Sequence, residues 1–169
     1  MKNALVLCAA FCCCAFEAFG ATDKPQKRVD LAAVVTKADA EAVLGEPVND
    51  PQPRNAEESD SYYSRCNYYG QNDNKSLVMR VRQVMNGKLD AKTEFKMISS
   101  SGSKLKSLDN LGDSARVYTS GPQNGLSRVL MLYVVKGNSM ITVALGGMDD
   151  ENVAMEKAKS LVKKILKQL

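Results

Sequence analysis

The chain has 169 residues, of which 44% are hydrophobic and 25% charged, with a net charge of +4, five Cys and no His or Trp. This length suits one domain or two very small ones, and the composition is typical of a folded globular protein. The absence of His excludes every mechanism that needs an imidazole, including Ser-His-Asp hydrolysis, His-ligated zinc and axial-His haem.

The N-terminal segment 1–20 predicts a secretory signal peptide. An early positive charge precedes the apolar run Ala4–Phe16, and the small residues Ala18 and Gly20 stand before a cleavage site ahead of Ala21. The run holds about thirteen residues, whereas a membrane-spanning helix needs roughly 20. We therefore expect a periplasmic or secreted protein with no transmembrane segment after cleavage. The alternative is a signal peptide that is retained as an anchor.

Four of the five Cys lie in this segment, so the mature chain contains only Cys66. One thiol cannot form a disulfide within its own chain, and a lone Cys is most often a small buried residue. We expect Cys66 to be buried. The alternative is a thiol that reacts or forms a bond between two chains.

The mature chain is predicted to begin with a flexible leader over 21–30, followed by a single domain over 31–169. Thr36 suits the start of a helix and Gly45 suits its end, which predicts a short helix over Lys37–Leu44.

Three further segments follow from their composition. Asp30–Val35 is expected to form a short helical turn. Asn49–Asp60 contains two Pro and has no hydrophobic period, so we expect a loop there. Asp90–Ser99 has apolar residues at helical spacing and predicts a second helix.

Strands are predicted where apolar or aromatic residues run between turn signals. The predicted strands are a weak one at Pro47-Val48, then Tyr62–Tyr69, Ser76–Met85, Ala115–Thr119, Arg128–Val135 and Met140–Leu145. The last two lack alternation, which suggests burial on both faces.

The clearest helix occupies the C-terminal segment, from the acidic residues at 149–151 to Leu169. Its apolar stripe consists of Ala154, Ala158, Leu161, Ile165 and Leu169, widened by Val162 and Leu166. The element order is αβββαβββα. Short turns between strands imply a mostly antiparallel sheet of five or six strands, with helices packed on one face, which is the α+β class.

The segment 62–69 holds four of the six Tyr and supplies the candidate site. Alternation along a strand places Tyr63, Arg65 and Tyr69 on the face opposite to Cys66. Arg80 and Arg82 of the neighbouring strand can share that face. Tyr and Arg are enriched on recognition surfaces, so we predict a docking face for an anionic or sugar-like ligand or a peptide. The alternative is an ordinary solvated sheet face.

Charge is divided along the chain: residues 39–60 carry a net charge of −6 and residues 61–136 a net charge of +7. This division can steer partners, or it can mean that the two segments lie against each other. The acidic pairs Glu57-Glu58 and Asp149-Asp150 are typical of loops and helix starts. We expect no catalytic residue, metal or cofactor, and no nucleic-acid partner.

Two motifs stand out along the chain. The first is the Thr36 helix followed by Leu44-Gly45-Glu46-Pro47-Val48, with Cys66-Asn67-Tyr68 on a later strand, and the second is Leu111-Gly112-Asp113-Ser114-Ala115. Together they resemble motifs of small exported bacterial domains of unknown function, which are secreted or lipid-anchored. The resemblance implies a PsbP-like α+β sandwich and supplies no catalytic residue. Phe11 stands before Cys12 where lipid-anchored members have a small residue, which argues against a lipid tether.

The sequence thus favours an exported, non-catalytic domain that binds an envelope protein or a small ligand through its Tyr/Arg face. Two alternatives remain. A carboxylate-dependent envelope hydrolase would show a deep pocket with converging acids, and a structural accessory subunit of an envelope complex would show a large apolar patch.

Overall fold

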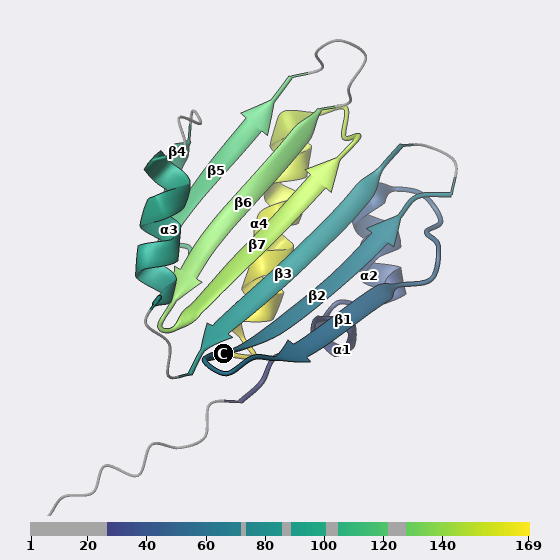
Figure 1. Ribbon diagram of the computed structural model, residues 1–169. Coiled ribbons are helices and arrows are strands. Elements are labelled where there is room, and N and C mark those ends of the chain that lie inside the picture. Colours follow the sequence, from purple (N-terminus) through teal and green to yellow (C-terminus); the bar gives the residue numbers. More distant parts are fainter. Residues whose placement is uncertain (1–26, 72–73, 86–88, 101–104, 122–127) are drawn as a thin grey trace, which may run out of the picture.

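A seven-stranded antiparallel sheet with helices on both faces forms the protein in the computed structural model (Figure 1), which describes residues 27–71, 74–85, 89–100, 105–121 and 128–169. The helices are α1 (Leu31–Val34), α2 (Lys37–Leu44), α3 (Ala91–Ser100) and α4 (Glu151–Leu166). The strands are β1 (Gln52–Glu57), β2 (Ser61–Tyr69), β3 (Ser76–Val84), β4 (Lys106–Leu108), β5 (Ser114–Ser120), β6 (Val129–Lys136) and β7 (Ser139–Gly146).

The sheet consists of two meanders joined side by side, in the order β1-β2-β3-β7-β6-β5-β4. The chain leaves β3, passes through α3 and begins again at the far edge with β4, so that the last strand, β7, returns to pair with β3. All pairs are antiparallel. The predicted α+β class and antiparallel sheet are therefore confirmed, with seven strands in place of five or six.

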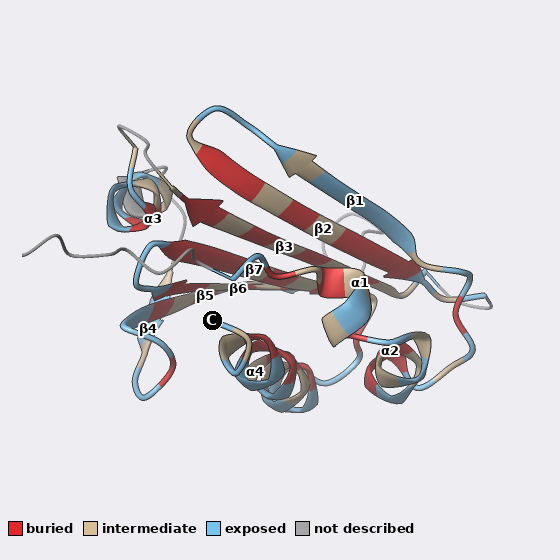
Figure 2. Cartoon of the chain, turned by 90° about the horizontal axis from the view of Figure 1, so that it is seen from below, coloured by how far each residue is buried: buried red, intermediate tan, exposed pale blue. Residues whose placement is uncertain are grey.

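The main core lies between the sheet and three helices, α1, α2 and α4, which cover one face (Figure 2). Alternate residues of β3, β6 and β7 point into it, because side chains along a strand alternate between the two faces. The predicted stripe of α4 is buried at Ala154, Ala158, Leu161, Val162 and Ile165. The last member of the predicted stripe, Leu169, is instead 39% exposed.

Both ends of α2 and the start of α4 are fixed by capping residues at positions that the sequence indicated. Thr36 accepts a hydrogen bond from the Asp39 amide while Asp39 accepts one from the Thr36 amide, a capping box that starts α2. Gly45 ends the helix in the left-handed region, with φ +74°. Asp150 caps α4 by accepting bonds from the amides of residues 152 and 153.

The packed part of the chain extends two residues before the predicted boundary at 31. Val29 is buried, and its amide donates to Gln83 Oε1 at 2.7 Å. The predicted signal peptide, 1–20, and most of the predicted leader lie outside the described residues. Within the described residues, no helix is long and apolar enough to cross a membrane.

Three predictions about the elements are wrong. The segment predicted as a loop over Asn49–Asp60 contains β1, and Val48 forms only an isolated bridge with Gly70 in place of a strand. The strands β6 and β7 are not buried on both faces, because alternate residues are only half-buried over much of their length.

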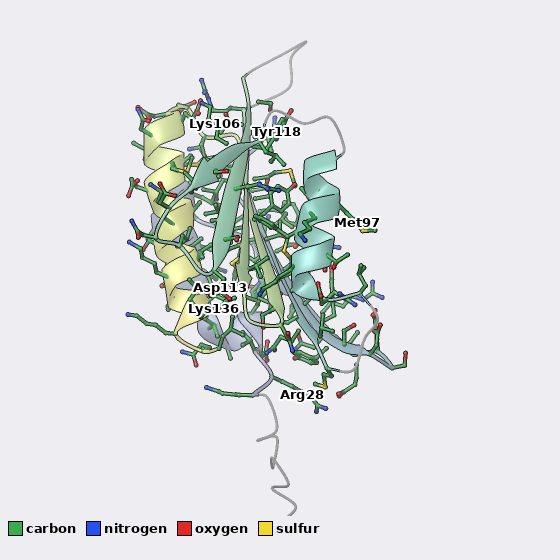
Figure 3. The ribbon with its side chains drawn as sticks, turned by 90° about the vertical axis from the view of Figure 1, so that its left-hand side faces the viewer. Arg28, Met97, Lys106, Asp113, Tyr118 and Lys136 are labelled. Carbon is green, nitrogen blue, oxygen red and sulfur yellow. The ribbon has the colours of Figure 1, made fainter. Side chains whose placement is uncertain are left out.

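A fourth correction concerns the prediction that the helices pack on one face of the sheet, because α3 lies on the face opposite to the other helices (Figure 3). Phe95 and Ala91 pack there against Val135 and Met140, forming a second, smaller core. Periodicity predicted the helix but gave no indication of its face.

The turn at Leu111-Gly112-Asp113 yields a stability prediction with a matched control. Gly112 and Gly137 both have positive φ, at +67° and +54°. A Cβ at Gly112 would lie 2.5 Å from the Val135 carbonyl oxygen, whereas a Cβ at Gly137 would meet nothing within 4 Å.

We therefore expect Gly137→Ala to lower the free energy of unfolding by about 1–2 kcal/mol, the cost of a left-handed residue with a side chain. Gly112→Ala adds a backbone clash and should cost about 1–3 kcal/mol more. Urea unfolding of the two variants measures the difference. Equal losses would contradict this account of the turn.

Candidate functional site

The face of the sheet opposite to α1, α2 and α4 is only partly covered. On that side α3 packs against β3, β6 and β7, and no described helix lies over β1 and β2 (Figure 2). We call the uncovered side of these two strands the β1–β2 face. Its outward residues are Gln52, Arg54 and Ala56 of β1, with Tyr63, Arg65, Asn67 and Tyr69 of β2.

Three arginines lie side by side across this face and its neighbour strand. The register pairs Arg54 of β1 with Arg65 of β2, and Arg65 with Arg80 of β3. Side chains directly opposite each other on antiparallel strands are close neighbours, and like charges in such pairs are destabilising. Negatively charged groups nearby would therefore stabilise this row of three guanidinium groups.

Arg80 and Arg82 obtain that charge from α3. Glu94 accepts a hydrogen bond from Arg80 Nη2 at 2.7 Å through one carboxylate oxygen, and from Arg82 Nη1 at 3.2 Å through the other. The side chains of Arg82 and Glu94 are only 12% and 17% exposed. Arg82 Nη1 also donates to the Leu89 carbonyl oxygen at 3.2 Å, just before the start of α3.

Arg54 and Arg65 have no such partner. In the part of the chain that the structure describes, neither of them pairs with a carboxylate. Arg54 is exposed and Arg65 is half-buried. The positive charge that the row leaves uncompensated is thus concentrated on the β1–β2 face.

Polar side chains hold Arg65 in place. Arg65 Nε donates to Asn67 Oδ1 at 3.1 Å, and Asn67 Nδ2 donates to the Tyr69 hydroxyl at 3.2 Å. The Asn67 side chain is buried beneath its neighbours. Asn67 engages Nε, and the two Nη groups of a guanidinium are the pair of donors that can bind a carboxylate or phosphate through two parallel hydrogen bonds.

The aromatic residues border the arginine row. Tyr63 packs against Arg80, with the guanidinium carbon 5.3 Å from the ring centroid, and Tyr69 is exposed at the opposite end of the face. Two open hollows lie along β1 on either side of Arg54. One, of about 210 Å³, is lined by Gln52, Pro53, Arg54, Arg65 and Asn67, and the other, of about 240 Å³, by Arg54, Ala56, Glu58 and Tyr63.

The structure thus brings Tyr63, Arg65 and Tyr69 onto one face with Arg80 and Arg82 of the adjacent strand, as alternation predicted. The five residues have different surroundings. Arg80 and Arg82 bind Glu94 of α3, whereas Tyr63, Arg65 and Tyr69 belong to the β1–β2 face. Arg54 was missed because its segment was interpreted as a loop. The −6 charge of residues 39–60 gave no indication that their one base would stand beside Arg65.

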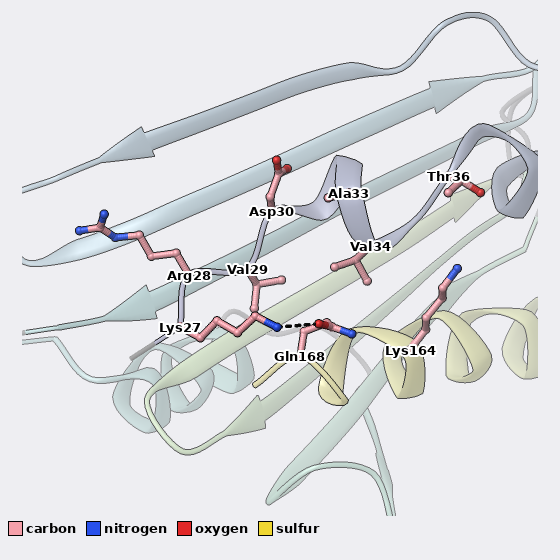
Figure 4. Close-up of a pocket in the computed structure, with 9 residues that line it drawn as sticks. All are labelled: Lys27, Arg28, Val29, Asp30, Ala33, Val34, Thr36, Lys164 and Gln168. Atoms are coloured by element: carbon pink, nitrogen blue, oxygen red, sulfur yellow. Dashed lines mark hydrogen bonds between the residues drawn. The ribbon is translucent and has the colours of Figure 1, made fainter. Parts of the chain in front are cut away.

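A larger hollow, of about 450 Å³, lies on the helix face between the N-terminal segment, α1 and the end of α4 (Figure 4). Its cations already have partners. Lys27 donates to Gln168 at 3.0 Å, Arg28 pairs with Glu57, and Lys164 pairs with Asp39.

Burial raises the pKa of Asp39, but hydrogen bonds from Lys164 and Thr36 outweigh this effect and hold the pKa below its usual value. We interpret this hollow as the junction that fastens the N-terminal segment to α4.

The acidic pairs are engaged in local structure. Glu57 pairs with Arg28, Glu58 accepts a bond from Ser61, and Asp150 caps α4. Among the described residues, no group of three His, Cys, Asp or Glu side chains is placed to hold a metal ion.

Cys66 is a free thiol that lies fully buried in the main core, as expected. Burial raises its pKa, although a hydrogen bond with Tyr68 opposes the shift. The Tyr68 hydroxyl in turn donates to the Val35 carbonyl oxygen at 2.6 Å. Cys66 and Tyr68 therefore fasten α1 to the sheet.

Comparison with known proteins provides a fold relative only. No family model matches the sequence, and no curated protein matches it. The crystal structure of the extracellular domain of PknH from Mycobacterium tuberculosis superposes with a TM-score of 0.52 and 14% sequence identity. The match covers 84% of this chain and 98% of that chain. At this identity the likeness concerns the fold alone.

We predict that the two hydrogen bonds of Glu94 help to hold α3 on the sheet. We expect Glu94→Gln to speed hydrogen exchange of the Phe95 amide by about tenfold, because a hydrogen bond to a charged group contributes about 1.5 kcal/mol or more. Lys96→Gln, on the exposed side of the same helix, is the control and should leave the rate unchanged. NMR-detected exchange measures both. Unaltered protection in Glu94→Gln would show that apolar packing alone holds α3.

Proposed function

We propose that this protein is an exported, non-catalytic domain that binds a negatively charged envelope partner through the β1–β2 face. The observation that carries the proposal is the pair Arg54 and Arg65, which stand directly opposite each other without a carboxylate partner among the described residues. Guanidinium groups in this arrangement recognise planar anions, and nearby Tyr side chains supply contact area at low entropic cost.

Export is proposed from the N-terminal segment 1–20, whose apolar run and small residues are those of a signal peptide. The location would be periplasmic or secreted. We further propose kinship with the small exported bacterial domains that share the Leu-Gly-x-Pro-Val and Leu-Gly-Asp-x-Ala motifs.

The two alternatives receive less support. A carboxylate-dependent hydrolase needs acids that converge in a pocket, whereas Glu57, Glu58 and Asp150 each bind a neighbouring group. An accessory subunit held by apolar contacts needs a continuous apolar patch. The exposed large apolar residues of the described chain are dispersed: Tyr69, Met97, Val153 and Leu169.

Charge reversal tests the proposal. We expect Arg54→Glu with Arg65→Glu to reduce partner capture at least about tenfold in a cross-linking pull-down from the envelope fraction, because each reversal turns a charge-assisted bond into repulsion. The matched control is Lys163→Glu with Lys167→Glu. It makes the same change in net charge at exposed positions of the C-terminal helix, on the opposite face.

The two double variants give distinct outcomes. Retained capture by the control together with loss in the arginine variant supports the β1–β2 face. Undiminished capture by both variants would contradict it. An equal reduction of capture in both variants would also contradict it, because only the overall charge would then matter. Circular dichroism of each variant verifies that the fold is intact.

A further inference from the structure

We propose that the partner presents an extended acidic peptide segment, which adds to the free edge of β1 as an eighth strand. This inference rests on the proposed function, since it uses the same arginines, and it specifies the chemistry of the partner. Among the described strands, β1 stands at the edge of the sheet and pairs with β2 alone (Figure 1). Strand addition to an exposed sheet edge is a recurrent mode of peptide recognition.

The register shows which backbone groups β1 already uses. Just beyond the strand, the Glu58 amide donates to the Ser61 carbonyl oxygen at 2.8 Å. Hydrogen-bonded and non-hydrogen-bonded pairs alternate along an antiparallel ladder. Ala56 and Arg54 therefore direct their amide and carbonyl groups toward β2.

The intervening residues direct theirs to the outer edge. These are Pro53, Asn55 and Glu57, each paired in register with β2 at a non-hydrogen-bonded position. Pro53 has no amide hydrogen, which is compatible with an outward position. The edge thus offers two amide donors and three carbonyl acceptors, enough for a short added strand.

Arg54 favours a carboxylate at the position opposite it on an added strand. The backbone amide and carbonyl groups of Arg54 are directed toward Arg65 of β2. A residue opposite Arg54 on an added antiparallel strand would therefore form a non-hydrogen-bonded pair with it. In such pairs the Cα atoms are only about 4.5 Å apart and the side chains are closest. A carboxylate there would reach Arg54 and relieve its repulsion with Arg65.

The two hollows beside Arg54 fit the same geometry. They open on the β1–β2 face, before and after Arg54 along β1, and every second side chain of an added strand would point toward that face. A second copy of this chain is a poorer occupant, because its β1 carries one carboxylate, Glu57, which already pairs with Arg28.

The experiment uses the peptide acetyl-Gly-Thr-Glu-Thr-Glu-Thr-Glu-Gly-amide, with a version that has Lys in place of Glu as the control ligand. The isotope-labelled protein is titrated with each peptide and followed by NMR. We expect the Asn55 and Glu57 amides to shift and to gain exchange protection with the Glu peptide alone. Hα–Hα contacts should appear between the peptide and Arg54 or Ala56.

A matched pair of variants isolates the backbone contribution. Asn55→Ala and Asn55→Pro both remove the side-chain bond between Asn55 Oδ1 and Ser64 Oγ. Only the Pro variant also removes the outward amide hydrogen. We expect it to bind the Glu peptide at least about fivefold more weakly than the Ala variant, because a backbone hydrogen bond contributes about 1 kcal/mol.

Failure of this inference differs from failure of the proposed function. Equal peptide affinity in the two Asn55 variants, with loss in Arg54→Glu/Arg65→Glu, would overturn strand addition and leave an anion-binding face. No affinity for the Glu peptide in the wild-type chain would also overturn strand addition, and the envelope pull-down would then decide the face by itself. Should Asn55→Pro not fold, the Hα–Hα contacts in the wild-type chain decide the question.

Discussion

The carboxylate of Glu94, placed between Arg80 and Arg82, is the interaction on which the arrangement of this face depends. It is the contact by which α3 reaches the charged part of the sheet, and both Glu94 and Arg82 are largely withdrawn from solvent. Separating this carboxylate from its two guanidinium partners is costly, because each charge would lose its partner where little water reaches it. Glu94 thereby neutralises one end of the arginine row and leaves the other end unneutralised.

The position of α3 follows from this ion pair and from the small core formed by Phe95 and Ala91. Because α3 covers β3, β6 and β7, the outer strands β1 and β2 remain uncovered on that side. Behind this face, β2 is supported by α1 and by the contacts of Cys66 and Tyr68, whereas β1 is held by its pairing with β2. The hydrogen bonds that hold Arg65 on β2 reduce the ordering entropy that this side chain would lose on binding the anionic partner that we propose.

The sequence was informative where hydrophobic periodicity was strong. It predicted α4, the capped helix α2 and the strands β2, β3, β6 and β7, and alternation placed Tyr63, Arg65 and Tyr69 on one face. It failed at β1, because Gln52–Glu57 is an edge strand with almost every residue exposed and so carries no apolar pattern. Arg54 was missed with it. The engagement of Arg80 and Arg82 was equally inaccessible, since it depends on which face of the sheet α3 covers.

The measurement that tests the central claim most directly is NMR of the arginine side chains, observed with and without the acidic Glu peptide. The account predicts that the guanidinium groups of Arg80 and Arg82 are held in the free protein, and that their signals change little on titration. It predicts that the signals of Arg54 and Arg65 shift and sharpen into a bound state. Shifts confined to Arg80 and Arg82, or to the cations of α4, would contradict the assignment of the β1–β2 face.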